Sequence, residues 1–279
     1  MRNWKLFMLL GLVLWSLVPV WAETFTAPGH LILSTTREGD NVRFTLKSLA
    51  TFDLTVTIEF TRLENMKANC RLPCTFTLPG GETICPLVIS PGNPRKSYYY
   101  NFKYHFISGT MNASHDDNYV YTLPYQSGTK HLVGQGYDGK FSHFGNERFA
   151  LDFHMPVGTP VLAARDGVVI GVKQDSNQGG SDVSFADFAN FVMIRHLDGT
   201  TADYKHLRQN GAAVRVRQKV KVGDLLGYSG NTGHSTCPHL HFMVYKGVDG
   251  NTRQTFPTKF RTSRSSAEIL LQGQTYTAP

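Results

Sequence analysis

Long apolar runs and nucleic-acid-binding patterns are both scarce in this chain of 279 residues. The one long apolar run, residues 6–17, lies near the N-terminus. No other segment has the length and apolar character that a membrane-spanning helix requires. Basic and aromatic residues form no array of the kind that binds nucleic acid. We therefore predict no nucleic-acid partner and no stable membrane span once the N-terminal run is removed.

Cysteine is also sparse, with four residues in the chain. Cys70, Cys74 and Cys85 cluster in the sequence, whereas Cys237 lies far from them. A structural zinc site needs four soft ligands close together, and no histidine lies near the cluster, which disfavours such a site. In an exported protein we expect a disulfide among the three clustered cysteines, although the sequence leaves the pairing of all four open.

The N-terminus has the layout of a secretory signal peptide. Arg2 and Lys5 give a basic start, residues 6–17 are apolar, and Ala22 ends the segment with a small side chain. We expect cleavage after Ala22, because the apolar run is short for an uncleaved anchor. The mature protein would then be exported, either periplasmic or secreted. Loss of the two basic residues lowers the formal net charge of +7 by two, and the remaining positive charge suits an anionic partner such as a cell-wall polymer.

The body of the chain reads as an all-β protein. Hydrophobic residues make up 41% of the sequence, which is enough for a sizeable core. Residues 55–60 and 101–106 alternate between apolar and polar, and Pro- and Gly-rich turns separate such runs. This pattern predicts a β-sandwich-like domain over residues 23–125. After a polar linker at 125–129, residues 126–250 form a second, glycine-rich β domain, and residues 251–279 read as a polar tail.

The second domain contains the residue types of a catalytic zinc site. Residues 239–244 read as a strand, in which alternation places His239 and His241 on one face. Further candidates lie upstream, at His143 and Asp152 and at His206. A catalytic zinc has three protein ligands and a water, whose pKa the metal lowers to about 7. Imidazoles that do not bind metal can transfer protons or stabilise an oxyanion.

Three motifs in this domain resemble those of the lysostaphin/LytM-type zinc metallopeptidases, which cut the peptide bridges or stems of peptidoglycan. The motifs are GTPV at residues 158–161, YKHL at 204–207 and GHSTCPHLHF at 233–242, and the resemblance extends over about residues 134–245. It implies a β-rich peptidase domain with an open groove. It also implies one Zn²⁺ ion bound by His143, Asp152 and His241, catalytic roles for His206 and His239, and a place for Tyr204 in the lining of the site.

Two further polar residues are candidates for substrate contacts. Asn190 and Ser235 could bind the backbone of a peptide, and they could equally stabilise turns. We list them with Tyr204 as predicted substrate-binding residues.

The chain departs from the family pattern at two positions. The family usually has His-x-Gly-x-Asp, and Arg148 stands where that histidine is expected. His143 would have to reach the metal from a longer loop. His154, which shares the strand face of Asp152, is the substitute ligand, and His131 is a remoter one. At the second position Cys237 replaces the usual glycine.

Two functions follow from these observations. The first is an exported zinc endopeptidase that hydrolyses peptide bonds in peptidoglycan cross-links or stems, with metal-activated water as the nucleophile. The alternative is a catalytically inactive family member that binds the cell wall or activates a partner hydrolase. The departure at Arg148 favours the alternative, whereas the retained His206, His239 and His241 favour the enzyme.

Overall fold

The computed structural model describes residues 22–279. The predicted signal peptide therefore lies outside the described residues, except for its last residue, Ala22. Within the described part the fold is all-β, as predicted, and its only helices are the short 3₁₀ segments η1 (Gly145–Glu147) and η2 (Val183–Phe188). Neither is long and apolar enough to cross a membrane.

The described residues form two compact units. One contains residues 22–111 together with Gly247–Thr252, and the other contains Asn112–Lys246 and Arg253–Pro279. This division differs from the predicted boundaries at residues 125 and 250. The predicted linker starts at Tyr125, whose side chain is buried in the second unit and whose hydroxyl donates to the carbonyl of Tyr276 (2.8 Å). The predicted polar tail thus supplies buried side chains to the second unit.

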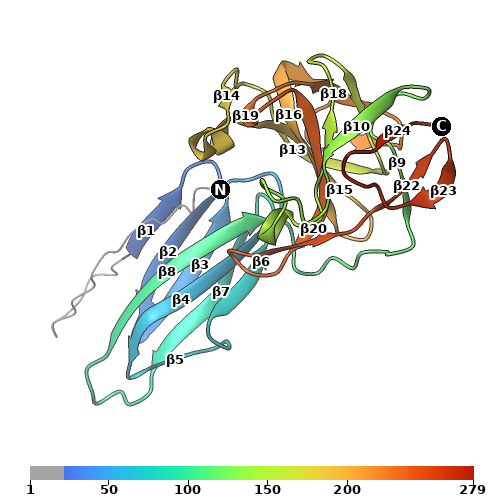
Figure 1. Cartoon of the computed structure of the whole chain (residues 1–279). Coiled ribbons are helices and arrows are strands. Elements are labelled where there is room, and N and C mark those ends of the chain that lie inside the picture. Colours follow the sequence, from blue (N-terminus) through green and yellow to red (C-terminus); the bar gives the residue numbers. More distant parts are fainter. Residues whose placement is uncertain (1–21) are drawn as a thin grey trace. The chain divides into compact units, whose positions relative to one another are not determined.

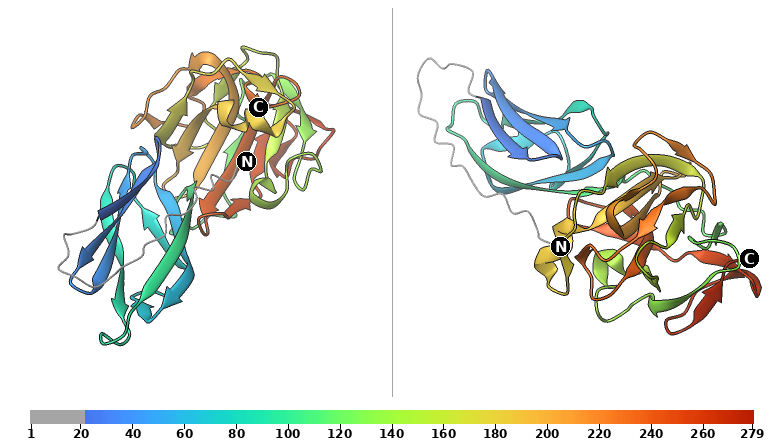
Figure 2. Two further views of the ribbon diagram at one scale, coloured as in Figure 1. Left: turned by 90° about the vertical axis from the view of Figure 1, so that its left-hand side faces the viewer. Right: turned by 90° about the horizontal axis from the view of Figure 1, so that it is seen from above.

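The first unit is a β-sandwich, as expected, and its two layers are visible in Figure 2. One sheet has the order β1-β2-β3-β7-β5 and the other the order β6-β4-β8. Side chains from both sheets, such as Phe44 and Val56, are fully buried in one common core. The strands are β1 (Ala22–Ala27), β2 (Leu31–Glu38), β3 (Asn41–Ser48), β4 (Leu54–Glu64), β5 (Met66–Ala68), β6 (Cys74–Leu78), β7 (Thr83–Pro91) and β8 (Tyr99–Ser108).

One disulfide connects Cys70 and Cys74 in this unit. The expectation of a disulfide among the three clustered cysteines is therefore confirmed. Cys85 is an exposed free thiol, and Cys237, in the other unit, is free as well.

The second unit is built on an 11-stranded sheet with the central order β17-β13-β15-β16-β20-β11-β10-β24. Strands β12 and β18 pair with each other, β18 also pairs with β16, and β21 pairs with β20. The strands of the sheet are β10 (Lys130–Gln135), β11 (Leu151–His154), β12 (Pro160–Leu162), β13 (Gly167–Lys173), β15 (Asn190–Arg195), β16 (Thr201–Ala212), β17 (Lys219–Val220), β18 (Leu225–Ser229), β20 (His239–Gly247), β21 (Arg253–Phe256) and β24 (Thr275–Thr277).

Two smaller sheets complete the second unit. One has the order β23-β22-β9, and the other is the parallel pair β14 and β19. Their strands are β9 (Val120–Thr122), β22 (Lys259–Thr262), β23 (Ser265–Glu268), β14 (Gly179–Gly180) and β19 (Gly233–His234).

Strand β20, labelled in Figure 1, lies between β16 and β11 in the sheet. Leu240, Phe242 and Val244 are buried in the core of the unit. His239 and His241 alternate with them and so lie on the opposite face. Because β20 is central and its hydrogen bonds to both neighbours are formed, the two histidines start from a rigid backbone.

A β-bulge brings His206 to that same face. Lys205 of β16 pairs with Phe191 of β15, whereas Leu207 pairs with the next residue, Asn190. His206 is therefore an extra residue in the ladder, and its φ of 65° lies in the left-handed region. Without the bulge, His206 would lie on the face of Tyr204, which belongs to the core.

Candidate metal centre

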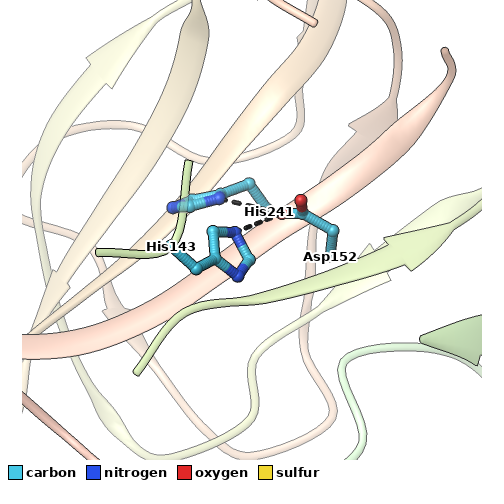
Figure 3. A group of neighbouring side chains, drawn as sticks. All are labelled: His143, Asp152 and His241. Carbon is cyan, nitrogen blue, oxygen red and sulfur yellow. Dashed lines mark hydrogen bonds and ion pairs between the residues drawn. The ribbon is translucent and has the colours of Figure 1, made fainter. Parts of the chain in front are cut away.

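Three of the predicted ligands converge in the second unit (Figure 3). His143 comes from the loop before η1, Asp152 from β11 and His241 from β20. The potential ligand atoms all lie within 4.8 Å of one another. Asp152 stands directly opposite His241 in the β11–β20 ladder, so the sheet register sets this pair. All three residues are buried.

Two of the three pairs of donor atoms have about the spacing of ligands on a tetrahedral metal ion. Asp152 Oδ1 lies 3.2 Å from His143 Nε2 and 2.9 Å from His241 Nδ1. Two ligands about 2.0–2.1 Å from a tetrahedral zinc ion lie roughly 3.3 Å apart. His143 Nδ1 donates to the carbonyl of Gly136 (2.9 Å). Its Nε2 is therefore unprotonated in the neutral ring, and the lone pair of this nitrogen faces the carboxylate of Asp152. Among residues 22–279, this buried Nε2 has no hydrogen-bond partner, as expected of an atom that binds a cation.

The electrostatics of the ligand set are those of a cation site. Burial alone would raise the pKa of Asp152, but the contacts with His143 and His241 hold it well below the usual range. Burial alone would lower the pKa of His241, but Asp152 and Glu147 raise it to about 9. Asp152 is thus an ionised carboxylate in a buried site, and positive charge there is strongly favoured.

Gln135 of β10 positions both Asp152 and the loop that carries His143. Its Nε2 donates to Asp152 Oδ2 (3.1 Å), and its Oε1 accepts from the backbone N–H groups of Phe141 (3.1 Å) and Ser142 (3.2 Å). Gln135 was not predicted. An isolated glutamine carries no sequence signal that separates it from a surface residue, so only the structure identifies this contact.

Glu147 is a second contact that the sequence did not predict. Its Oε2 lies 3.1 Å from His241 Nε2, on the ring edge opposite Asp152. Glu147 lies in the loop between His143 and Asp152, which is longer than the spacing between these two ligands in the family motif. The acidic residue in this loop was the one sequence feature that could have indicated the contact. Its surroundings are considered in detail below.

The two predicted catalytic histidines lie beside the three ligands. The ring centroids of His206 and His239 are 4.5 Å apart, and that of His206 is 5.8 Å from that of His241. His206 Nδ1 donates to the carbonyl of Thr232 (2.7 Å), and His239 Nδ1 donates to that of Cys237 (2.8 Å). Each ring thus keeps its Nε2 as the nitrogen able to accept a proton. Burial lowers the pKa of both, so both are neutral at pH 7.

A groove of about 530 Å³ opens over these residues. Asp152, His206, His239 and His241 are among the residues that line it, as is Ser235. The hydroxyl of Ser235 lies 3.1 Å from His239 Nδ1. Most of the predicted site residues thus line an open groove, as the resemblance implied.

Two of the predicted substrate-binding residues lie elsewhere. Tyr204 is fully buried in the core, where its hydroxyl accepts from the N–H of Ala164 (2.9 Å), because it points away from His206 across the bulge. Asn190 is also fully buried, and its side chain bonds the backbone of Ser176 and Leu207. Neither side chain can touch a substrate in the groove. Ser235 alone of the three predicted residues lines it.

The alternative first ligands lie outside the cluster. His154 is exposed at the end of β11, with its Nε2 3.7 Å from the thiol of Cys237. Two residues of strand span about 6.6 Å, which carries His154 beyond Asp152 and away from His143. His131 donates instead to the carbonyl of His154 (2.9 Å). Arg148, which occupies the expected histidine position, forms an exposed ion pair with Asp138 (2.7 Å).

His196 lies outside the site and should make the second unit acid-sensitive. It is buried, and burial lowers its pKa to about 4, although its Nδ1 donates to the carbonyl of Asp166 (2.8 Å). The unfolded chain therefore takes up this proton first, and stability should fall as the pH drops from about 6.5 to about 4. The difference corresponds to roughly 3 kcal/mol of unfolding free energy.

Denaturant unfolding of metal-free protein at several pH values measures this effect. His196→Asn keeps a donor for the Asp166 carbonyl and removes the titrating ring, so its stability should fall less steeply below pH 6.5 than that of the wild type. Parallel pH profiles for the two proteins would contradict the assignment.

Comparison with known proteins finds a family match over most of the predicted site. Peptidase family M23 matches residues 147–255. The matched segment contains Asp152, His206, His239 and His241, whereas His143 precedes it.

Among curated proteins, the chain is 34% identical over 119 residues to the glycyl-glycine endopeptidase ALE-1 of Staphylococcus capitis, covering 43% of this chain and 30% of that protein. It is 34% identical over 128 residues to the peptidoglycan DD-endopeptidase ShyA of Vibrio cholerae, covering 44% and 27%. The chain thus spans less than a third of either relative.

Among solved structures, the catalytic domain of lysostaphin from Staphylococcus simulans is 30% identical, with a TM-score of 0.33. The alignment covers 46% of this chain and 87% of that domain.

Proposed function

We propose that this chain, in which peptidase family M23 matches residues 147–255, is an exported zinc-dependent endopeptidase that hydrolyses peptide bonds in bacterial peptidoglycan. The observation that carries the proposal is the convergence of His143, Asp152 and His241 next to a groove that is lined by Asp152 and His241 together with His206 and His239. The sequence pattern of residues 1–22 supports a periplasmic or secreted location.

The residues divide into two roles. His143 Nε2, Asp152 Oδ1 and His241 Nδ1 would hold one Zn²⁺ ion, which would polarise a peptide carbonyl and make a water molecule more acidic. His206 and His239 line the same groove and are held through Nδ1, so their Nε2 atoms could accept and return a proton or stabilise an oxyanion. Backbone carbonyls fix both rings through Nδ1, so neither needs to reorient during a reaction.

The inactive alternative loses support from the position of His143. Its only sequence basis was Arg148 in place of the family histidine. The ligand atom of His143 lies within 4.8 Å of those of Asp152 and His241, which supports His143 as the third ligand from its longer loop. The proposal therefore treats the departure at Arg148 as a change of loop length rather than the loss of a ligand.

Metal removal tests the proposal directly. We expect the mature chain, residues 23–279, to solubilise purified peptidoglycan and release new amino termini when loaded with zinc. Chelation should reduce the release to background, and added zinc should restore it. Wild-type protein that carries no stoichiometric metal, or that keeps its activity under complete chelation, would refute a zinc-dependent reaction.

A further inference from the structure

Glu147 stands behind the metal-binding histidine of β20. It ends η1, within the eight residues that separate His143 from Asp152. Its side chain is 13% exposed, and its Oε2 lies 3.1 Å from His241 Nε2. On the other edge of the ring, Nδ1 lies 2.9 Å from Asp152 Oδ1. The imidazole is thus held between two carboxylates, one of which belongs to the predicted ligand set and one of which does not.

The charge of Glu147 is compensated from the side away from His241. Lys205 Nζ and Arg253 Nη1 lie 3.6 and 3.7 Å from Glu147 Oε1. These two cations place positive charge beside the carboxylate and favour its ionised form. An ionised carboxylate only accepts hydrogen bonds, so His241 Nε2 must be the donor.

The two cations are themselves anchored. Lys205 Nζ lies 3.2 Å from Asp203 Oδ2, and the guanidinium of Arg253 lies over the ring of Tyr245 at 4.7 Å. The hydroxyl of Tyr245 donates to Asp203 Oδ1 (3.2 Å). These groups come from β16, β20 and β21, so the position of Glu147 is fixed by the sheet and not only by its own loop.

We propose that Glu147 is a positioning residue of the metal centre. It holds His241 through Nε2–H and leaves the Nδ1 lone pair directed at the ion. The proposal rests on the proposed function, because it requires a metal bound at Nδ1. The longer loop between His143 and Asp152 then has a second use, since it supplies both a ligand and the carboxylate that orients another ligand. Such outer hydrogen bonds fix the ring and increase the basicity of the ligating nitrogen.

The test measures zinc affinity, by competition with a chromophoric chelator, for Glu147→Gln and Glu147→Ala. Loss of an outer partner typically weakens metal binding about 10–100-fold. Glu147→Gln keeps an acceptor and loses the charge, so its loss should be the smaller one, and Glu147→Ala should approach the upper end. Asp138→Asn is the matched control, because this exposed carboxylate lies near the same loop and pairs with Arg148 instead of His241; its affinity should equal that of the wild type.

A second readout separates positioning from general stability. Zinc-loaded wild type should show an imidazole Nε2–H proton of His241 that is protected from solvent exchange, and this signal should disappear in Glu147→Ala. Thermal unfolding in chelator establishes that the variant is folded.

The outcomes for Glu147 and for the metal site are distinguishable. If the wild type binds zinc and folded Glu147→Ala binds it within about twofold, the role of Glu147 is refuted while the metal site stands. If the wild type itself binds no zinc, the proposed function fails first.

Discussion

A His143→Ala variant is expected to purify without stoichiometric zinc and to release no new amino termini from peptidoglycan. Three protein ligands hold a catalytic zinc ion, and removal of one leaves a two-ligand site. The two remaining ligands, Asp152 and His241, already lie 2.9 Å apart and can form an ion pair with each other without any metal. Metal analysis should therefore fall from about one zinc per chain to near zero.

His154→Ala is the matched control for this experiment. His154 is the alternative ligand suggested by sequence, two residues beyond Asp152, and it is exposed at the end of its strand. Its removal should leave the zinc content unchanged. Loss of zinc in His154→Ala together with retention in His143→Ala would reverse the assignment of the first ligand.

Replacing either histidine beside the ligands should abolish activity and spare the metal. His206→Asn and His239→Ala each remove one imidazole that can transfer a proton, and such a group typically contributes about 10²–10⁴-fold to the rate. Asparagine is chosen at position 206 because it tolerates the left-handed backbone conformation found there. Peptidoglycan hydrolysis by each variant is compared with its zinc content.

The metal content makes this second prediction specific. A variant that has lost both zinc and activity would show that the histidine belongs to the ligand set. A variant with zinc and full activity would show that it has no catalytic role. Zinc with a large loss of rate is the expected combination. Ser235→Ala, which removes the hydroxyl 3.1 Å from His239 Nδ1, should have a smaller effect, because the carbonyl of Cys237 still fixes the ring.

The sequence predicts the positions of His239 and His241 because the alternation of apolar and polar residues and the family motif agree in this segment. Residues 239–244 alternate as a strand, and β20 has that pattern, with His239 and His241 on one face and the core on the other. The partner of His241 was harder to predict, since the register of β11 against β20 depends on contacts far apart in the chain. His143 was ambiguous for the same reason: the path of a loop is not encoded in a local pattern.

The misplaced residues have one physical cause. Tyr204 precedes His206 by two residues, so an unbroken strand would place both side chains on one face. The bulge at His206 places the two side chains on opposite faces. Residues 203–209 contain no glycine or proline that would indicate a change of register. Asn190 lies opposite the bulge, and its side-chain amide donates a hydrogen bond to the backbone carbonyl of Ser176. Local propensity does not reveal an irregularity that tertiary pairing stabilises.

The tail was misjudged because its apolar residues are few and widely spaced. Phe260 and Tyr276 are nonetheless fully or almost fully buried in the second unit. A polar stretch can complete a core with a few large side chains, each of which buries up to about 150–250 Å². Composition averaged over residues 251–279 hides this contribution.

The extra residue at His206 also determines which kinds of genetic change this protein can tolerate. A substitution in β16 alters one side chain, but an in-frame deletion of a single codon near position 206 would close the bulge and restore regular pairing with β15. Residues on either side of the closed bulge would keep their inward and outward orientations, because Lys205 and Leu207 already pair with consecutive residues of β15, but the catalytic face would lose one side chain. Laboratory evolution of this chain should therefore confine insertions and deletions to surface loops, because one lost codon in this part of β16 would remove the extra residue that places His206 on the catalytic face while leaving the core pattern intact.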